Sequence, residues 1–179
     1  RQQPPEANGA MTIGEVMKYL PHRYPFVMVD RVTLIEGNRL VAIWPGFHDK
    51  LFGIAIDVGS TTIAAHLTNL STGEVTASAG LMNPQIRFGE DLMSRVSYVM
   101  MNPGGEKEMT VAIRQALNTL AQEVASQGGI ELSDILEVVL VGNPVMHHLF
   151  LGIDPTELGG APFALATGLA VTCPANELD

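Results

Sequence analysis

Several features that would mark a particular class of protein are scarce in this sequence. One cysteine, Cys173, occurs among 179 residues. A single cysteine allows no disulfide within the chain, so we expect a reducing compartment and not a secreted, disulfide-bonded scaffold. No apolar run approaches the ~18 residues that a membrane-spanning helix needs, and no charged and then apolar leader opens the sequence. We therefore expect a cytoplasmic protein with no membrane contact.

Basic residues are also few. The chain has 10 Lys and Arg against 19 Asp and Glu, which gives a formal net charge of -9. Proteins that bind nucleic acid gather basic side chains against the phosphate backbone, so we expect no nucleic-acid partner. Apolar side chains are plentiful, because 46% of the residues are hydrophobic and only 16% are charged. This balance predicts a globular chain of one domain or slightly more.

The stretch GIAIDVGSTTIAAHL, residues 53–67, carries the strongest chemical signal. The apolar run at 54–56 predicts a strand covered on both faces, and it delivers Asp57 to a turn of small residues at 58–61. Small side chains and several backbone N–H groups allow such a turn to wrap an anion closely. A carboxylate beside a phosphate needs an intervening cation, so Asp57 fits Mg²⁺ held directly or through its waters. Asp-x-Gly-Ser is also an ordinary hairpin turn, and that alternative stays open.

Hydrophobic periodicity predicts the remaining elements. We expect Asp91 to cap a helix, and we expect the longest helix to bury a stripe formed by Met109, Ile113, Leu117, Leu120 and Val124. A run rich in Val and Leu predicts a buried strand that completes a strand–helix–strand crossover. The expected elements are strands at 62–67, 74–79 and 135–141, and helices at 92–101, 106–127 and 145–151.

Four polar residues outside the turn are further candidates. Asn143 follows the strand at 135–141, so it could face the same cleft as Asp57, or it could simply cap the helix that Pro144 begins. Arg87 could neutralise a phosphate or a partner's carboxylate, or it could be an ordinary exposed arginine. His147 and His148 are adjacent, so they point in different directions and do not form a zinc pair. We expect one of them to be buried.

Three separated stretches, IAIDVGSTTIAAHL, MNPQIRFGEDLMSRV and VGNPVMHHLFLGIDP, resemble the ATPase domain of the corrinoid-protein reductive activators. The first also resembles the first phosphate loop of the actin, hexokinase and heat-shock-chaperone ATPases. The resemblance covers about residues 43–179 and implies an α/β fold, a ribonuclease-H-like (actin-like ATPase) lobe with a mixed sheet. It implies ATP and Mg²⁺ as cofactors, with the metal on Asp57. The residues expected to bind the nucleotide phosphates are Gly59, Ser60, Thr61, Thr62 and Asn143.

The family implies an ATP-driven protein that helps an electron reach the cobalt of a B12-dependent partner, a corrinoid protein or methyltransferase. A [2Fe–2S] cluster is expected of the full-length family but not of this chain, because the cluster needs four cysteines. No second D-x-G-x-[GST] motif follows Asp57. We therefore expect residues 53–179 to be the first lobe of an incomplete ATPase domain, whose hydrolysis alone would be very slow.

The first 52 residues have a different character. Residues 1–10 predict a flexible arm, and 44–52 predict an aromatic linker. Residues 11–43 resemble the opening of the 3-hydroxyacyl-[acyl carrier protein] dehydratases, whose hot-dog fold begins with the signature LPHRYPF-x-x-VDRV, here at 20–32. A helix followed by a hairpin, with strands at 26–32 and 39–43, is the expected local structure.

The dehydratase motifs that hold the catalytic His and Glu do not occur in this chain, and His22 is assigned no catalytic role. The apolar face of Phe26, Met28 and Val32 would be left uncovered in such a piece, so it predicts packing on the rest of the chain or self-association. Two alternatives to the ATP-binding lobe stay open: a fragment of a dehydratase of fatty-acid synthesis, and a noncatalytic interaction fragment.

Overall fold

The computed structural model describes residues 31–36, 39–45 and 50–178. The chain divides into two compact units, residues 1–50 and 51–179. In the first unit, strands β1 (Arg31–Glu36) and β2 (Arg39–Pro45) pair antiparallel, with a register shift between Leu34 and Ile35. A hairpin that turns between Glu36 and Arg39 is therefore present, but its first strand lies at 31–36 and not at the expected 26–32, of which 26–30 lie outside the described residues. The arm at 1–10, the helix expected before Pro21, and His22 lie outside the described residues.

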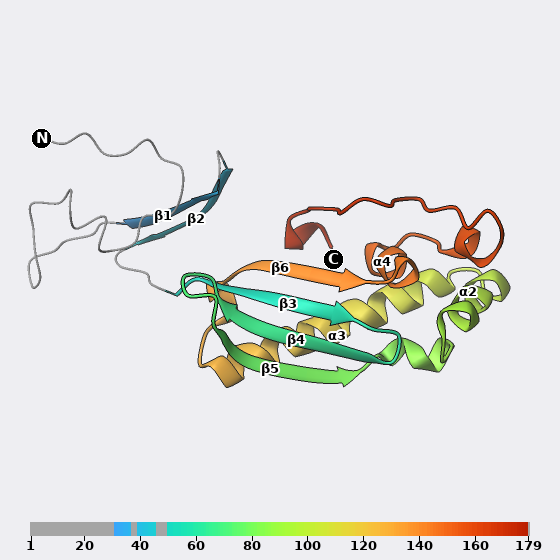
Figure 1. The fold of residues 1–179 in the computed structure, drawn as a ribbon, viewed down its shortest axis with the longest axis horizontal. Helices are drawn as coiled ribbons and strands as arrows, with labels where there is room; N and C mark the ends of the chain where they lie inside the picture. Colours follow the sequence, from blue (N-terminus) through green and yellow to red (C-terminus); the bar gives the residue numbers. More distant parts are fainter. Residues whose placement is uncertain (1–30, 37–38, 46–49, 179) are drawn as a thin grey trace, which may run out of the picture. The chain divides into compact units, whose positions relative to one another are not determined.

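The second unit contains a four-stranded mixed sheet (Figure 1). Its strands are β3 (Phe52–Val58), β4 (Thr62–Asn69), β5 (Val75–Met82) and β6 (Ile135–Gly142), in the spatial order β5-β4-β3-β6. The first three form an antiparallel meander, whereas β6 is parallel to β3. Because β5 and β6 run the same way at opposite edges of the sheet, the segment between them crosses over β4 and β3.

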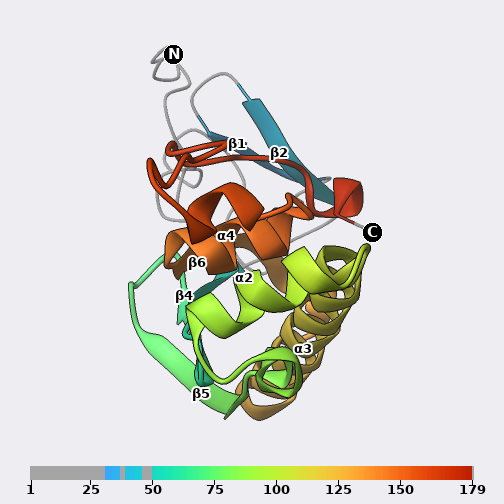
Figure 2. The ribbon, with the colours of Figure 1, turned by 90° about the vertical axis from the view of Figure 1, so that its right-hand side faces the viewer.

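The crossover contains the short 3₁₀ helix η1 (Pro84–Phe88), the helices α2 (Leu92–Met101) and α3 (Gly105–Gly128), and η2 (Leu132–Asp134). After β6 come α4 (Pro144–Leu151) and a segment whose only regular elements are η3 (Thr156–Gly159) and η4 (Ala175–Glu177). Figures 1 and 2 show α3 lying along one face of the sheet, and α4 at the end where β3 and β6 finish. Helices α2, α3 and α4 lie within two residues of their expected bounds.

The core lies between α3 and the face of the sheet that it covers. Ile54, Ile56 and Val58 of β3 alternate with exposed residues, as the period of a strand requires. The whole expected stripe of α3 is buried, with Leu120 and Val124 at 0% exposure. Asp91 caps α2, because its Oδ1 accepts a bond from Ser94 N at 2.7 Å, and Gly129 ends α3 at a φ of 65°.

Two expectations about burial were wrong. We expected β3 to be covered on both faces, but Ala55 and Asp57 are exposed on the face opposite α3. We expected β6 to be a buried strand, but Val139 and Val141 are 51% and 58% exposed. The physical reason is that β6 is an edge strand and that, in the second unit, the helices pack on a single face of the sheet. An apolar composition predicts a strand here but does not say how many of its sides are covered.

Candidate functional site

The turn between β3 and β4 lies at the carboxyl end of β3. Val58 pairs with Ile63, so residues 59–62 close the hairpin. Gly59 donates its N–H to Thr62 O at 3.1 Å. An added Cβ at Gly59 would lie only 2.5 Å from that same oxygen. The turn is therefore so tight that a residue without a side chain is required at Gly59.

The backbone N–H groups of Ser60 and Thr61 donate no hydrogen bond within the described part of the chain. Thr61 and Thr62 are exposed and Ser60 is partly exposed. The three residues therefore present hydroxyls and N–H donors at the surface, which is the chemistry that an anion such as phosphate requires.

Asp57 lies two residues before the turn, on the open face of the sheet. Its neighbours across the two adjacent strands are Ala64 and Val141, which offer no hydrogen bond to its carboxylate. Within the described residues that carboxylate has no hydrogen-bond partner, so both oxygens are available to a cation or its waters. Mg²⁺ is commonly held by one or two carboxylates and keeps several waters, so the single exposed carboxylate of Asp57 is a ligand of the kind that this ion takes.

Asn143 is brought beside the turn by the parallel register of β3 and β6. Gly142 of β6 pairs with Val58 of β3. The next residues in the chain are Asn143 after Gly142 and Gly59 after Val58. The Asn143 side chain accepts a bond from Met146 N at 3.0 Å and thus caps α4. The capping alternative is therefore observed, and the same geometry places the N-terminus of α4 at the edge of the sheet that carries the turn.

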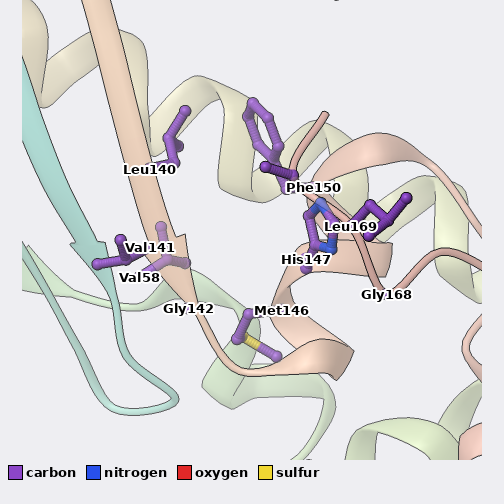
Figure 3. A pocket seen from close by; sticks show the side chains of 10 residues that line it. Val58, Leu140, Val141, Gly142, Met146, His147, Phe150, Gly168 and Leu169 are labelled. Atoms are coloured by element: carbon purple, nitrogen blue, oxygen red, sulfur yellow. The ribbon is translucent and has the colours of Figure 1, made fainter. Parts of the chain in front are cut away.

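A cavity of about 310 Å³ opens next to these elements. Figure 3 shows Val58 and Val141 of the sheet on one side of it, and His147, Phe150 and Leu169 on the other. Its walls are mainly apolar, and the sequence had not indicated it because residues 168–170 are distant in the chain. The full set of lining residues is Val58, Leu140, Val141, Gly142, Met146, His147, Phe150, Gly168, Leu169 and Ala170.

The two histidines have different environments, as expected. His148 is 1% exposed; its Nδ1 lies 2.7 Å from Pro144 O, and its Nε2 accepts a bond from Ala166 N at 3.1 Å. His148 therefore ties α4 to the C-terminal segment and is not free to bind a ligand. His147 is partly exposed at the cavity. Among the described residues no group of three or more His, Cys, Asp or Glu is placed to hold a metal ion.

Of the two alternatives for Arg87, the exposed arginine is the one observed: its side chain is exposed and its guanidinium stacks on Phe88 at 4.6 Å. The cation that touches the turn is Arg95, which is completely buried and donates to Ser60 O. The sequence does contain a signal for a buried Arg95, which is its position on α2. Arg95 lies between Leu92 and Val96 on the apolar stripe of the helix, where a charged residue is unexpected unless it has buried partners.

A family model described as the RACo middle region matches residues 52–179 of the chain. That range covers the whole second unit except its first residue, and well over half of the chain. The chain belongs to this family.

Two proteins named for the activation of corrinoid or of a corrinoid protein are similar to this member of the RACo middle-region family. The corrinoid activation enzyme RamQ of Eubacterium limosum is 31% identical over 151 residues, which cover 83% of this chain and 26% of RamQ. A solved structure described as the reductive activator for corrinoid, iron-sulfur protein superposes with a TM-score of 0.74 at 34% identity, over 84% of this chain and 24% of that one. The chain thus spans about a quarter of the length of these relatives, and its mixed α/β architecture is that of the solved neighbour.

The chain is also similar, over shorter stretches, to 3-hydroxyacyl-[acyl-carrier-protein] dehydratases. The enzyme of Aromatoleum aromaticum is 59% identical over 76 residues, which cover 35% of this chain and 52% of that protein. The enzyme of Thioalkalivibrio sulfidiphilus is 74% identical over 34 residues, or 18% of this chain. These matches are fragments and do not extend to a whole dehydratase.

Among the described residues, no helix combines the length and apolar character needed to cross a membrane. Cys173 is a free, partly exposed thiol.

Proposed function

We propose that residues 53–179 form the phosphate-binding lobe of an ATP-dependent reductive activator that acts on a corrinoid protein. The observation that carries this proposal is the turn at Gly59. Its N–H groups and hydroxyls lie near the carboxylate of Asp57, and within the part of the chain that the structure describes neither those N–H groups nor that carboxylate has a hydrogen-bond partner. Membership of the RACo middle-region family and the names of two relatives, an enzyme of corrinoid activation and a reductive activator for a corrinoid protein, support the partner class.

In this proposal the lobe has the ribonuclease-H-like topology of the actin-like ATPases. The strand order β5-β4-β3-β6, with an antiparallel meander followed by a parallel crossover strand, supports it. In such a sheet, ligands bind where the carboxyl ends of parallel strands meet. Here those ends belong to β3 and β6, and they carry Asp57 and Asn143.

Each element of the site would have a separate task. Asp57 would hold Mg²⁺, directly or through water, and the metal would neutralise phosphate charge. The N–H groups of Ser60 and Thr61, with the hydroxyls of Ser60, Thr61 and Thr62, would bind the phosphate oxygens. The N-terminus of α4, capped by Asn143, would add positive potential from the side. An exposed turn of this kind can bind phosphate, but it cannot exclude water from it, so we propose that this chain alone binds nucleotide without turning it over quickly.

For residues 11–43 we propose descent from the opening of a hot-dog-fold dehydratase. The fragment matches of 59% and 74% identity support this ancestry, as does the signature at 20–32.

The test is a thermal melt of this chain with and without Mg-ATP, alongside Asp57→Asn. A ligand present at ten times its Kd stabilises the native state by about 1.4 kcal/mol, which raises Tm by several degrees in a small domain. We expect that rise in the parent, its loss when EDTA removes Mg²⁺, and its loss in Asp57→Asn.

The matched control is Glu137→Gln. Glu137 is an exposed carboxylate on the same open face, opposite Gly53 at the other end of β3. Four residues along a strand place it roughly 13 Å from Asp57. This variant should therefore keep the full Mg-ATP shift. A cooperative parent melt that Mg-ATP leaves unmoved, or an Asp57→Asn variant that shifts as the parent does, would refute the proposed role of the turn.

A further inference from the structure

A cluster of buried polar side chains lies directly beneath the turn at residues 59–61. Asn83, at the end of β5, Gln85 of η1 and Arg95 of α2 are each no more than 1% exposed. Met146 of α4 completes the cluster through its sulfur, which lies 3.1 Å from Arg95 Nη1 and 3.7 Å from Asn83 Nδ2. The cluster thus joins four elements at one point below the candidate phosphate site.

Three successive backbone carbonyl groups of the turn, at residues 59–61, accept hydrogen bonds from Asn83 and Arg95 of this cluster. Asn83 Nδ2 donates to Gly59 O at 2.8 Å, and Arg95 Nη2 donates to Ser60 O. The backbone N–H of Asn83 donates to Thr61 O at 2.8 Å. Each carbonyl is therefore directed toward its donor and away from solvent.

Because the trans peptide is planar, a carbonyl that is held in place also fixes the direction of the N–H group of the next residue. The C=O of one residue and the N–H of the next point in opposite directions from a shared plane. When the carbonyls of Gly59 and Ser60 are held inward, the N–H groups of Ser60 and Thr61 must point outward. These are the two donors that have no partner within the described residues.

Arg95 is itself held rigidly. Its Nε donates to Gly89 O at 2.9 Å, and its Nη1 donates to Gln85 Oε1 at 3.2 Å. The amide of Gln85 is in turn fixed by a bond from its Nε2 to Met109 O at 3.0 Å. A fork of donors satisfied in this way has one position only, so the Ser60 carbonyl is aimed at a fixed point.

The positive charge of Arg95 needs its own explanation. Among the described residues no carboxylate forms an ion pair with it, and burial lowers the pKa of the guanidinium while the charge of Asp91 partly raises it. A buried cation without a paired anion is costly, and an apolar side chain would fill the same space more cheaply. A cation under a peptide group, however, adds positive potential to the N–H side of that group, where an anion would bind.

We propose that Arg95 is a positioning residue of the phosphate turn, which directs the Ser60 carbonyl inward and the Thr61 N–H outward and supplies a fixed positive charge beneath the bound phosphate. The part of this inference that concerns the charge of Arg95 rests on the proposed nucleotide-binding function. The part that concerns the orientation of the turn does not. Arg95 is a residue that the sequence had not indicated.

The experiment compares Arg95→Met and Arg95→Lys with the parent and with Arg87→Met. Arg87 is the matched control because its substitution removes the same charge from an exposed side chain on the segment that also leads to α2. Two quantities are measured in each protein. Calorimetry gives the Kd for Mg-ATP, and amide hydrogen exchange gives the protection of the Gly59 and Asn83 N–H groups, with buried Leu117 reporting global unfolding.

We expect Arg95→Met to weaken Mg-ATP binding by about tenfold or more, the size of effect that loss of a charge-assisted bond produces. Exchange at Gly59 and Asn83 should accelerate relative to Leu117. Arg95→Lys keeps the charge but loses the fork, so it should accelerate exchange similarly while retaining part of the affinity. Arg87→Met should match the parent in both measurements.

The two measurements separate the possible failures. If the parent does not bind Mg-ATP, the proposed function is wrong, and the exchange data still decide whether Arg95 orders the turn. If the parent binds but Arg95→Met keeps both its Kd and its Gly59 protection, the role of Arg95 is refuted while the proposed function stands. Should Arg95→Met fail to fold, Arg95→Lys decides: unchanged Gly59 protection in that variant would overturn the inference.

Discussion

Replacing Gly59 by alanine should destabilise the protein through a local steric conflict. The added Cβ would lie 2.5 Å from Thr62 O, closer than real Cβ atoms approach a backbone oxygen. That oxygen cannot move away freely, because it accepts the 3.1 Å bond from the N–H of Gly59 itself. Relief of the clash therefore costs this bond or displaces the turn.

The expected magnitude follows from the cost of overpacking a site whose neighbour is backbone. Such insertions cost about 1–3 kcal/mol. For a chain of this size, each kcal/mol lowers Tm by roughly 2–4 °C. Urea denaturation would therefore show a lower midpoint with an unchanged slope, because the native and unfolded states expose the same surface as before.

Gly160→Ala is the matched control. Gly160 is exposed at a φ of -148°, which any residue adopts, and nothing lies within 4 Å of the position of its added Cβ. Alanine there should be neutral, or it should stabilise by up to about 1 kcal/mol, because it restricts the unfolded chain. If Gly59→Ala unfolds at the same urea concentration as Gly160→Ala, the steric argument about the turn is wrong.

Two further predictions concern the helices. Leu120→Ala, at a position of α3 that is 0% exposed, should lower the free energy of unfolding by about 2–5 kcal/mol. Val111→Ala, on the exposed side of the same helix, should change it by no more than about 0.5 kcal/mol. Equal urea midpoints for the two variants would contradict the packing described above. The hydrogen bond from the Ser94 N–H lowers the pKa of Asp91 below its ordinary value of 3.8. The charged form of Asp91 therefore stabilises the folded state above pH 3.8, and this stabilisation is lost as the pH falls through the lowered pKa. Parent and Asp91→Asn should therefore differ in urea midpoint at pH 7 and converge as the pH falls below 3.8 and through the lowered pKa of Asp91. A difference that persists in stronger acid would show that the charge of Asp91 is not responsible.

The elements of the second unit could be predicted because their signals are local. The stripe on α3 repeats with the period of a helix, Asp91 and Asn143 precede apolar runs as capping residues do, and small residues interrupt the strands at the turn. Boundaries were less certain, and β5 extends to Met82, three residues beyond the expected end. The extension is set by pairing with β4, whose partner residues are distant in the sequence.

The candidate site could be predicted only in part, for the same reason. Asp57 and the turn form one continuous segment, so their chemistry could be predicted from that segment alone. The donors beneath the turn come from positions 24 and 35 residues further along the chain, as the bonds of Asn83 to Gly59 and of Arg95 to Ser60 show. The sequence offered Arg87 as one possible cation and did not indicate Arg95, because periodicity alone does not reveal which arginine faces inward with polar partners.

The sequence by itself determined the succession of strands and helices, the tight turn and the family to which the chain is similar, since each depends on residues near one another in the chain. Tertiary structure decided which carbonyls of the turn are anchored and which N–H groups are free. It also decided that β6 is an exposed edge and that the open face of the sheet carries Asp57. These properties depend on hydrogen bonds and packing between segments that meet only after the chain has folded.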